Sequence, residues 1–532
     1  MDIIIGIGGT GAKVVEAVLN LAAMGIGPNT LKVGFVDQDA SNGNLNRAIT
    51  VFENYRDARR FWRDGAPHQI DGTADCQLLK TNVQPIHGND GRWIPEIAAG
   101  ATLSRIFGDM GSDKFLFDAL FESGDDEEFE EQDLDLARGY RARPNIGAAA
   151  MTLRSLDEND AFWTAITAAI QDANAGDVRI MLAGSIFGGT GAAGFPTIAR
   201  LITNRLQRAG ITKRVKIGGI LMQPYFWFPD PGNGDEPNVA RAHEQKMQAK
   251  GALEHYARLL GPHGEDLFDH LYLVGWNRPF RIDRHNSGLG AQRNPALFPE
   301  FLAATAAMRF FATQWDADAP ATQEILESAR AEDHLFEWPE IPPIWDQPDS
   351  KQALHQQIGQ FLRFATAFKF WKPQISDDRQ RSALDGQKWY KGQGLSDVDW
   401  VNNSPAAALN QLERVIDNVL AWGACIDAYA RRDANHRFNL WHIGVPLLDA
   451  PVDFDTPNED PEIATEISGA DYNTLFSLIV HKYVEGDGPM PNTIDLSDSL
   501  TDFTVEGNHQ GMGRFVSALY NFSGIRPVVV AD

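Results

Sequence analysis

The strongest constraint on the fold is a set of apolar segments that lead, through glycine-rich turns, into helical patterns. Residues 2–7 are rich in isoleucine, glycines and apolar residues at helical spacing follow them, and residues 31–36 are again apolar. This order predicts a β-α-β unit. Strand and helix patterns alternate once more from about 158 to 313. Because such alternation is typical of parallel strands joined by helices, we expect a parallel sheet covered by helices.

The second alternating region supplies the remaining predicted strands, at 178–183, 215–222 and 271–275. Polar and aromatic residues from about 41 to 138 break the alternation, so we interpret this stretch as an insertion. It ends in an acidic block at 125–133, which we interpret as a solvated loop, with a contact to a basic partner surface as the alternative.

The expected domain organisation follows from these patterns. An α/β domain is predicted over 1–313. Beyond it prolines cluster, and helical patterns alternate with strand-like pieces near 438–445 and 528–530. We therefore expect a mixed α+β domain over 314–532.

The charge, the apolar runs and the cysteines of the chain limit the kinds of partner molecule and cellular location that we expect. The chain has 532 residues, with 47 Lys and Arg against 72 Asp and Glu and a formal net charge of −25. Such a charge repels the nucleic-acid backbone at long range, so we expect no nucleic-acid partner. No apolar run approaches the ~20 residues that span a bilayer, and the two cysteines lack metal-ligand spacing. A cytoplasmic protein without a membrane span is expected.

The first glycine turn, residues 6–11, lies where a strand leads into a helix. Gly8, Gly9, Thr10 and Gly11 are its candidate nucleotide-binding residues. Glycines let backbone N–H groups approach phosphate oxygens, and a helix N-terminus adds about half a positive charge.

The same turn permits a second interpretation. Its spacing fits Gly-x-Gly-x-x-Gly, and Asp37 stands at the end of the second strand, where it would accept a hydrogen bond from a ribose hydroxyl. An NAD-dependent oxidoreductase with a Rossmann domain is therefore an open alternative.

A second glycine turn, residues 184–194, occurs in the same setting. Gly188, Gly189, Thr190 and Gly191 follow an apolar strand and open a helix. Two such turns at one edge of a parallel sheet would hold one polyphosphate from both sides, through backbone amides and the Thr190 hydroxyl. Neither turn has the Gly-Lys-Ser/Thr ending of a Walker loop, so charge neutralisation would come from amides, helix dipoles and a metal ion.

Residues 188–199 resemble the signature loop and following helix of the tubulin superfamily, particularly the bacterial division tubulin FtsZ and the divergent bacterial tubulin-like proteins. The signature usually opens with three glycines, and here Phe187 stands at the first position. Four other segments are similar to segments of the family and occur in the same order as in the family. They are the first phosphate loop at 5–11, a strand end at 36–40, the third loop at 144–147 and a strand-end segment at 222–226.

This resemblance implies a Rossmann-like GTPase domain of the tubulin/FtsZ type, followed by a central helix. It also implies GTP or GDP as the ligand, with Mg²⁺. Asn145 and Gly147 would belong to the loop that faces the γ-phosphate, and Pro224 to a strand end beside the nucleotide. Asp37 and Asp39 would hold Mg²⁺ through water, or simply solvate the strand end. Lys13 would reach phosphate or lie in solvent.

The resemblance places the family's guanine-contacting helix at about 295–313. Glu300 is the candidate guanine reader, because a carboxylate accepts hydrogen bonds from the ring N–H and the exocyclic amine together. Asn294 is the second choice, and Phe298 would stack on the base. The alternatives are a Glu favoured by the first turn of a helix and a Phe in the core.

Catalytic acids are not defined by the sequence. The family carries an Asn-x-Asp-x-x-Asp pattern after the central helix, and this chain offers only weak matches. They are Asp316 and Asp318 directly after the helix, and Asp495 and Asp498 much further along the chain.

The function that the resemblance implies is GTP binding, with GTP hydrolysis completed across the interface of subunits that assemble head-to-tail into filaments. The insertion or the C-terminal domain would bind a protein partner. A nucleotide-gated scaffold with little hydrolysis is the alternative from another functional class.

Overall fold

The structure is a computed structural model. The residues that it describes are 1–39, 41–64, 68, 70, 76–95, 102–107, 111–121, 132–133, 144–154, 160–172, 177–211, 214–229, 242–259, 267–276, 278–282, 293–315, 324–328, 335–347, 349–402, 405–432, 437–481, 483 and 511–524.

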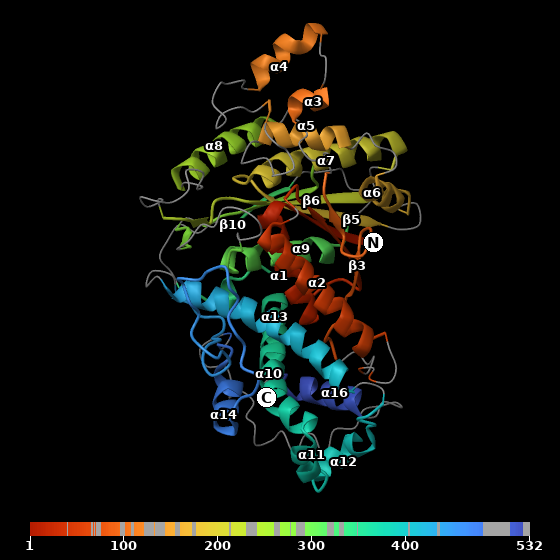
Figure 1. The fold of residues 1–532 in the computed structure, drawn as a ribbon, viewed down its shortest axis with the longest axis vertical. Coiled ribbons are helices and arrows are strands. Elements are labelled where there is room, and N and C mark those ends of the chain that lie inside the picture. Colours follow the sequence, from red (N-terminus) through yellow and green to blue (C-terminus); the bar gives the residue numbers. More distant parts are fainter. Residues whose placement is uncertain are drawn as a thin grey trace.

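A parallel sheet of eight strands forms the centre of the molecule (Figure 1). Its order is β10-β8-β6-β5-β1-β2-β3, and β4 also pairs with β2. The strands are β1 Asp2–Ile7, β2 Thr30–Val36, β3 Asn82–Pro85, β4 Arg92–Trp93, β5 Val178–Ser185, β6 Val215–Met222, β8 His270–Val274 and β10 Glu324–Ser328. Every pair of neighbours in this sheet is parallel. The prediction of a parallel α/β sheet is confirmed.

The strand order determines where a ligand can bind. From β1 the chain proceeds to β2 and β3 on one side, whereas β5, β6, β8 and β10 extend the sheet on the other side. This is a doubly wound, Rossmann-like order, in which the direction of winding reverses between β1 and β5. In such sheets ligands bind outside the carboxyl ends of the strands at this reversal.

Helices cover both faces of the sheet (Figure 1). One face carries α1 Gly8–Ala23, α2 Gly43–Trp62 and α9 Phe298–Ala312. The other face carries α5 Pro144–Arg154, α6 Ala161–Asp172, α7 Gly189–Ala209 and α8 Ala242–Leu259. Because both faces are covered, the strands are nearly continuous apolar runs.

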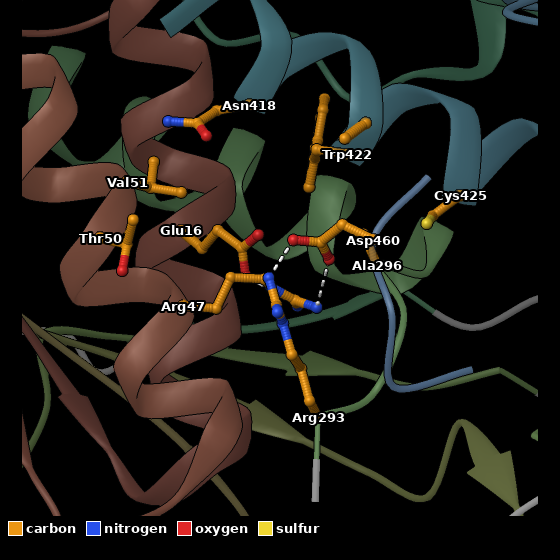
Figure 2. A pocket seen from close by; sticks show the side chains of 11 residues that line it. Glu16, Arg47, Thr50, Val51, Arg293, Ala296, Asn418, Trp422, Cys425 and Asp460 are labelled. Atoms are coloured by element: carbon orange, nitrogen blue, oxygen red, sulfur yellow. Dashed lines mark hydrogen bonds and ion pairs between the residues drawn. The ribbon is translucent and has the colours of Figure 1, made fainter. Parts of the chain in front are cut away.

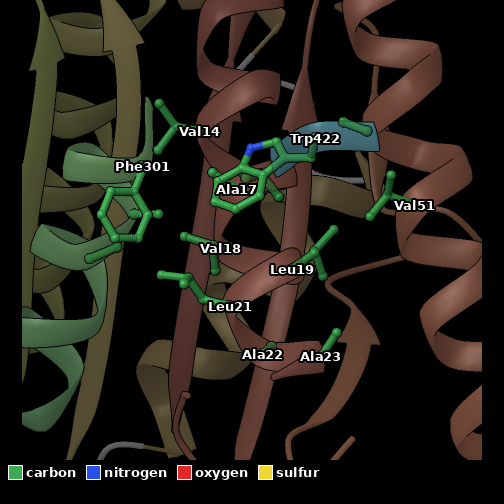
Figure 3. Close-up of a cluster of buried hydrophobic side chains, with 14 of the residues drawn as sticks. Val14, Ala17, Val18, Leu19, Leu21, Ala22, Ala23, Val51, Phe301 and Trp422 are labelled. Carbon is green, nitrogen blue, oxygen red and sulfur yellow. The ribbon is translucent and has the colours of Figure 1, made fainter. Parts of the chain in front are cut away.

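Helix α1 lies at the centre of the hydrophobic core. Figure 3 shows its apolar side chains beside Val51 of α2, Phe301 of α9 and Trp422 of the C-terminal helix α13. All three of these side chains are buried. Burying a large apolar side chain contributes about 1.5–3 kcal/mol, so contacts on every side of α1 hold the sheet and the C-terminal helices together.

The described residues after β10 are mainly helical. Their helices are α10 Ser350–Ser376, α11 Asp378–Leu384, α12 Lys388–Gly392, α13 Pro405–Arg432, α14 Gly469–Leu478 and α16 Met512–Phe522, with the 3₁₀ turns η3 Trp338–Glu340 and η4 Leu395–Asp397. Two small sheets pair β7 Phe226–Trp227 with β9 Phe280–Arg281, and β11 Leu335–Phe336 with β12 Arg437–Phe438.

The strand expected at 438–445 does not form beyond Phe438. Only an isolated antiparallel bridge forms here, between Trp441 and Val480, with the His442 N–H donating to the Ile479 carbonyl. Other backbone groups of the stretch bond to side chains: the Leu440 carbonyl accepts from Trp338 Nε1, and the Ile443 N–H donates to Asp427 Oδ2. The strand-like piece at 528–530 lies outside the described residues. Within the described residues this region is mainly helical, with the small β11–β12 sheet and isolated bridges, and the expectation of a mixed α+β domain over 314–532 stays a prediction.

Two expected boundaries also differ. Helix α2 and strands β3 and β4 belong to the sheet unit, although they fall within the stretch interpreted as an insertion from about 41 to 138. The sequence carries a signal for α2 that was missed: the buried residues Leu45, Ala48, Ile49, Phe52 and Tyr55 recur at helical spacing. Strand β10 extends the sheet beyond the expected domain end at 313.

A short arm extends from the helical layer that contains α5. It consists of α3 Leu103–Phe107, the 3₁₀ turn η1 Gly111–Asp113 and α4 Lys114–Leu120. Figure 1 shows this arm at one end of the molecule, beyond α5. None of the helices in the described ranges combines the length and apolar character required to cross a membrane.

Candidate functional site

The two glycine turns touch at the carboxyl edge of the sheet. β1 and β5 are parallel neighbours, with Gly6 opposite Ala183, so both strands end at the same edge. Gly8 has a φ of +73°, which glycine adopts without strain, and a Cβ built on it would lie 3.0 Å from the Gly191 nitrogen. A side chain at position 8 would therefore push the turns apart.

The start of α1 is equally close to β5. A Cβ built on Gly11 would lie 2.3 Å from the Ala183 carbonyl oxygen, far inside van der Waals contact. Glycine at position 11 thus lets the helix pack directly on the strand backbone, as the third glycine of a dinucleotide fingerprint does.

Two helix N-termini consequently adjoin at this edge. α1 begins at Gly8, α7 begins at Gly189 with Gly188 as its N-cap, and neither first turn contains an acidic residue. The first N–H groups of a helix lack partners inside the helix and carry partial positive charge. The paired N-termini are therefore suited to bind the oxygens of a phosphate group.

Asp37 connects the two sides of this edge. Its side chain is 2% exposed. Oδ1 accepts hydrogen bonds from the Thr190 hydroxyl at 2.9 Å and the Asp39 backbone N–H at 3.2 Å, and Oδ2 accepts one from Asn42 Nδ2 at 3.0 Å. Burial raises the pKa of the Asp37 carboxyl to about 7, although these hydrogen bonds oppose the rise. At neutral pH the carboxyl is therefore populated in both protonation states.

Asn42 is a site residue that the sequence analysis missed. Its Oδ1 caps α2 by accepting hydrogen bonds from the N–H groups of Asn44 at 3.0 Å and Leu45 at 3.3 Å. A Cβ built on Gly9 would lie 2.8 Å from Asn42 Nδ2. The Asn-Gly-Asn sequence at 42–44 is an N-cap signal, but it falls in the stretch interpreted as an insertion.

Lys13 and Glu300 form a buried ion pair beneath this edge. Lys13 Nζ lies 2.5 Å from Glu300 Oε1, both side chains are 1% exposed, and the same ammonium donates to the Pro295 carbonyl at 2.6 Å. Burial lowers the pKa of Lys13, while the Glu300 carboxylate opposes the change. The expectation that Lys13 reaches phosphate or lies in solvent is corrected, because its charge is neutralised inside the protein.

The Glu300 carboxylate has further partners within the protein. Oε1 accepts a hydrogen bond from the Tyr225 hydroxyl at 2.6 Å, and Oε2 accepts one from the Leu297 N–H at 3.1 Å, as in a capping box. Burial, reinforced by the Glu300 charge, raises the pKa of Tyr225. These contacts favour the structural alternative for Glu300 over guanine reading.

The other two residues expected at the base are also buried. Phe298 is 2% exposed and packs edge-to-face against Phe438, with ring centroids 5.5 Å apart. Asn294 is 6% exposed; its N–H donates to Asn44 Oδ1 at 2.7 Å, and its carbonyl accepts from Arg47 at 2.8 Å. Phe298 is thus packed in the core, whereas the Asn294 backbone is bonded to Asn44, whose Nδ2 would lie 3.3 Å from a Cβ built on Gly9.

The remaining predicted residues are placed as follows. Pro224 follows β6 and is half-buried, and Asp39 accepts hydrogen bonds from the N–H and hydroxyl of Ser41. Gly147 is buried in the first turn of α5, so the expected third loop is helical from residue 144. The catalytic candidates Asp316, Asp318, Asp495 and Asp498, and the side chain of Asn145, lie outside the described residues. Among the described side chains, no group of three or more His, Cys, Asp or Glu is arranged to hold a metal ion.

A small charged cavity lies between α1, α2 and α13 (Figure 2). Its volume is about 60 Å³. Arg47 pairs with Glu16 at 2.9 Å and lies 3.5 Å from Asp460, which also pairs with Arg293. Burial raises the pKa of the nearby Cys425 thiol to about 12, so this thiol is not a nucleophile at neutral pH. These ion pairs connect the sheet unit to the C-terminal part of the chain through charged side chains.

The first prediction concerns the Lys13–Glu300 pair. Glu300→Gln leaves the buried ammonium without its counter-charge, so we expect the free energy of unfolding to fall by about 3–5 kcal/mol. Urea unfolding measures the loss. The double variant Lys13→Met with Glu300→Gln should recover part of it, and equal stability of wild type and Glu300→Gln would contradict the assignment.

The second prediction concerns the pH dependence of stability. The pKa of Asp37 in the folded chain, about 7, lies above the ordinary 3.8. Between these values the folded state binds more protons than the unfolded state, so wild-type stability should fall as pH rises through this window and level off above it. Asp37→Asn removes this titration. The melting temperature of the variant minus that of wild type should therefore increase as the pH is raised from 5 to 8. Asp378→Asn, at an 89% exposed side chain, is the control for loss of one charge.

Comparison with known proteins adds no family assignment, because no family model matches the chain and no curated protein matches it. Functional inference therefore depends on the contact between the two glycine turns and on the buried carboxyl of Asp37 beside them.

Proposed function

We propose that this chain binds GTP or GDP, with Mg²⁺, at the carboxyl edge of β1 and β5, in the manner of the tubulin superfamily. The single observation that carries the proposal is the direct contact between the turn at Gly8 and the turn at Gly191. A dinucleotide domain needs only one such turn, whereas two adjoining turns present amides to a phosphate chain from both sides.

The phosphate-binding groups in this proposal belong mostly to the backbone. The N–H groups of Gly8, Gly9, Thr10 and Gly11 start α1, and those of Gly189, Thr190 and Gly191 start α7. Their positive potential would neutralise phosphate charge without a lysine. Lys13 is excluded from this role because it is paired with Glu300.

Asp37 is the residue proposed to hold Mg²⁺ through water. Mg²⁺ commonly keeps water and phosphate oxygens as ligands and needs only one or two carboxylates. When bound, the cation would neutralise phosphate charge. Because a nearby cation favours the ionised carboxyl, Asp37 would release its proton as the metal binds, and the ionised Oδ1 would still accept the hydrogen bond from the Thr190 hydroxyl.

The tubulin type, the guanine base and the assembly into filaments are proposed from the order of the similar sequence segments. Glu300 and Phe298 are not assigned to the base, since their side chains are paired and packed inside the protein. Asn294, whose hydrogen bonds to Asn44 and Arg47 are made by its backbone, stays the candidate base reader. GTP hydrolysis completed by an acid of a neighbouring subunit is part of the same proposal.

The third prediction tests nucleotide binding. Gly189→Asp adds a negative charge where phosphate would lie, so we expect the affinity for Mg-GTP, measured by calorimetry, to fall by at least about 100-fold, roughly 2.7 kcal/mol. An acid in the first turn of a helix is favoured by the dipole, so thermal stability should not fall.

Wild type should also release close to one proton on binding Mg-GTP below pH 7. The number of protons released is obtained from the binding enthalpies measured by calorimetry in buffers of different ionisation enthalpy.

Gly189→Ala is the matched control, because it removes the glycine without adding charge. The NAD-dependent alternative predicts NADH binding that Gly189→Asp does not change. That result, or equal GTP affinity in wild type and Gly189→Asp, would overturn the proposed function.

The fourth prediction tests assembly. With GTPγS, wild type should form polymers that sediment, and phosphate release from GTP should rise more steeply than in proportion to protein concentration. Gly189→Asp should show neither. Nucleotide binding without polymer and with phosphate release near zero would support the scaffold alternative and contradict the filament proposal.

A further inference from the structure

A cavity of about 720 Å³ opens at the amino ends of the central strands. Residues of β1, β2, β3 and β5 line it, together with the last turn of α9. A strand rises about 3.3 Å per residue, so Asp2 in this cavity lies about 20 Å from the turn at Gly8. Cavities of such a volume are typical of sites for small organic molecules. This cavity is therefore a second candidate ligand site, at the edge of the sheet opposite the glycine turns.

Part of the cavity wall is apolar. Met308 and Phe311 of α9 line it, and so does Ile344; all three side chains are buried. The ring of Trp345, which also lines the cavity, is half-buried. Contact with such side chains removes apolar ligand surface from water, and an aromatic ring offers a flat face for packing. The wall therefore favours a ligand with an aromatic or aliphatic body.

Arg179 neutralises the negative groups of the cavity wall. Asp2 is the only acid among the described residues that line the cavity. Arg179 Nε lies 2.5 Å from Asp2 Oδ1, and Arg179 Nη2 lies 2.9 Å from Asp2 Oδ2, so the ion pair is bidentate. Nη1 of the same guanidinium donates to the Phe311 carbonyl, near the end of α9, where the helix dipole places partial negative charge. These contacts reduce the repulsion that an anion would meet in the cavity.

Lys32 supplies an unpaired positive charge to the same cavity. Within the described part of the chain, neither its ammonium nor the side-chain amides of Gln84 and Gln314, which also line the cavity, have a hydrogen-bond or ion-pair partner. Lys32 is half-buried, and the two glutamines are exposed. A half-buried charge attracts an anion more strongly than a fully solvated one, and the amides can donate further hydrogen bonds. The cavity thus combines an apolar wall with one available cation.

We propose that this cavity binds a small organic carboxylate. Its carboxylate would pair with Lys32, and its aromatic or aliphatic body would pack against Trp345 and Phe311. A nucleotide is disfavoured here, because one lysine does not neutralise a polyphosphate. An inorganic anion is disfavoured because it would leave the apolar wall in contact with water.

The fifth prediction uses 4-benzoylbenzoate, a carboxylate with two aromatic rings, as the probe. Under ultraviolet light its ketone inserts into a nearby C–H bond and becomes an alcohol, which leaves the probe attached. Labelling of wild type should saturate, and mass spectrometry of digested protein should place the label at Met308 or Trp345. Lys32→Gln should raise the half-saturating probe concentration at least about 5-fold, the effect of losing one charge-assisted hydrogen bond. Its melting temperature should not change.

Lys388→Gln is the matched control, because Lys388 is an exposed lysine of α12 and does not line the cavity. This variant should be labelled as wild type. The methyl ester of the probe separates the charge from the apolar body. Since the ester has no carboxylate to pair with Lys32, wild type and Lys32→Gln should require the same concentration of it.

Three results would overturn the inference: labelling that does not saturate, a label attached outside the cavity, or equal half-saturating concentrations of the acid for wild type and Lys32→Gln. Protection of wild type by Mg-GTP, together with loss of labelling in Gly189→Asp, would also overturn it, because the probe would then occupy the glycine turns. We expect Gly189→Asp to be labelled as wild type, so the outcome does not depend on nucleotide binding.

Discussion

Backbone contact between the start of α1 and strand β5 is the constraint on which the rest of this structure depends. A Cβ at position 11 would lie 2.3 Å from the Ala183 carbonyl oxygen, so only glycine allows the helix to approach this closely. The approach brings the turn at Gly8 against Gly191 and leaves the two helix N-termini adjoining. Asp37, directly after the neighbouring strand β2, can then accept a hydrogen bond from Thr190 across the end of β1. A larger residue at position 11 would separate all of these groups together.

Polar groups inside the core also fix how the helices, including those of the C-terminal region, pack against the sheet. Lys13 and Glu16 of α1 are buried, and each is paired with an opposite charge, Glu300 of α9 and Arg47 of α2 respectively. Removing a charge from water costs several kcal/mol, so such pairs contribute little net stability but disfavour any arrangement that separates the partners. Together with Trp62 of α2, whose Nε1 donates to the Ala408 carbonyl of α13 at 2.9 Å, they fix how the helices lie relative to the sheet.

The sequence was sufficient to predict elements whose apolar pattern is continuous. β1, β2, β5 and β6 form within one or two residues of the expected bounds, because strands covered on both faces read as apolar runs. Helix α2 was missed although buried apolar residues such as Leu45, Ile49 and Phe52 recur in it at helical spacing, because many polar residues lie between them. The glycine turns carried a local signal, and so did the cap at Asn42. No local signal links Lys13 to Glu300, because their pairing arises from packing between distant segments, and the preference of Glu for a first helical turn suited a structural and a ligand-reading role equally well.

The Lys13–Glu300 pair also bears on the history of this sequence. A substitution that neutralises either residue alone leaves one charge stranded beside Tyr225, in a place that water does not reach. Such intermediates are selected against, so positions 13 and 300 should co-vary among descendants of a common ancestor, exchanging the charged pair for an apolar pair in near-simultaneous steps. In an alignment of such sequences, correlated substitutions at positions 13 and 300 would indicate that α9 packs against α1 throughout the family.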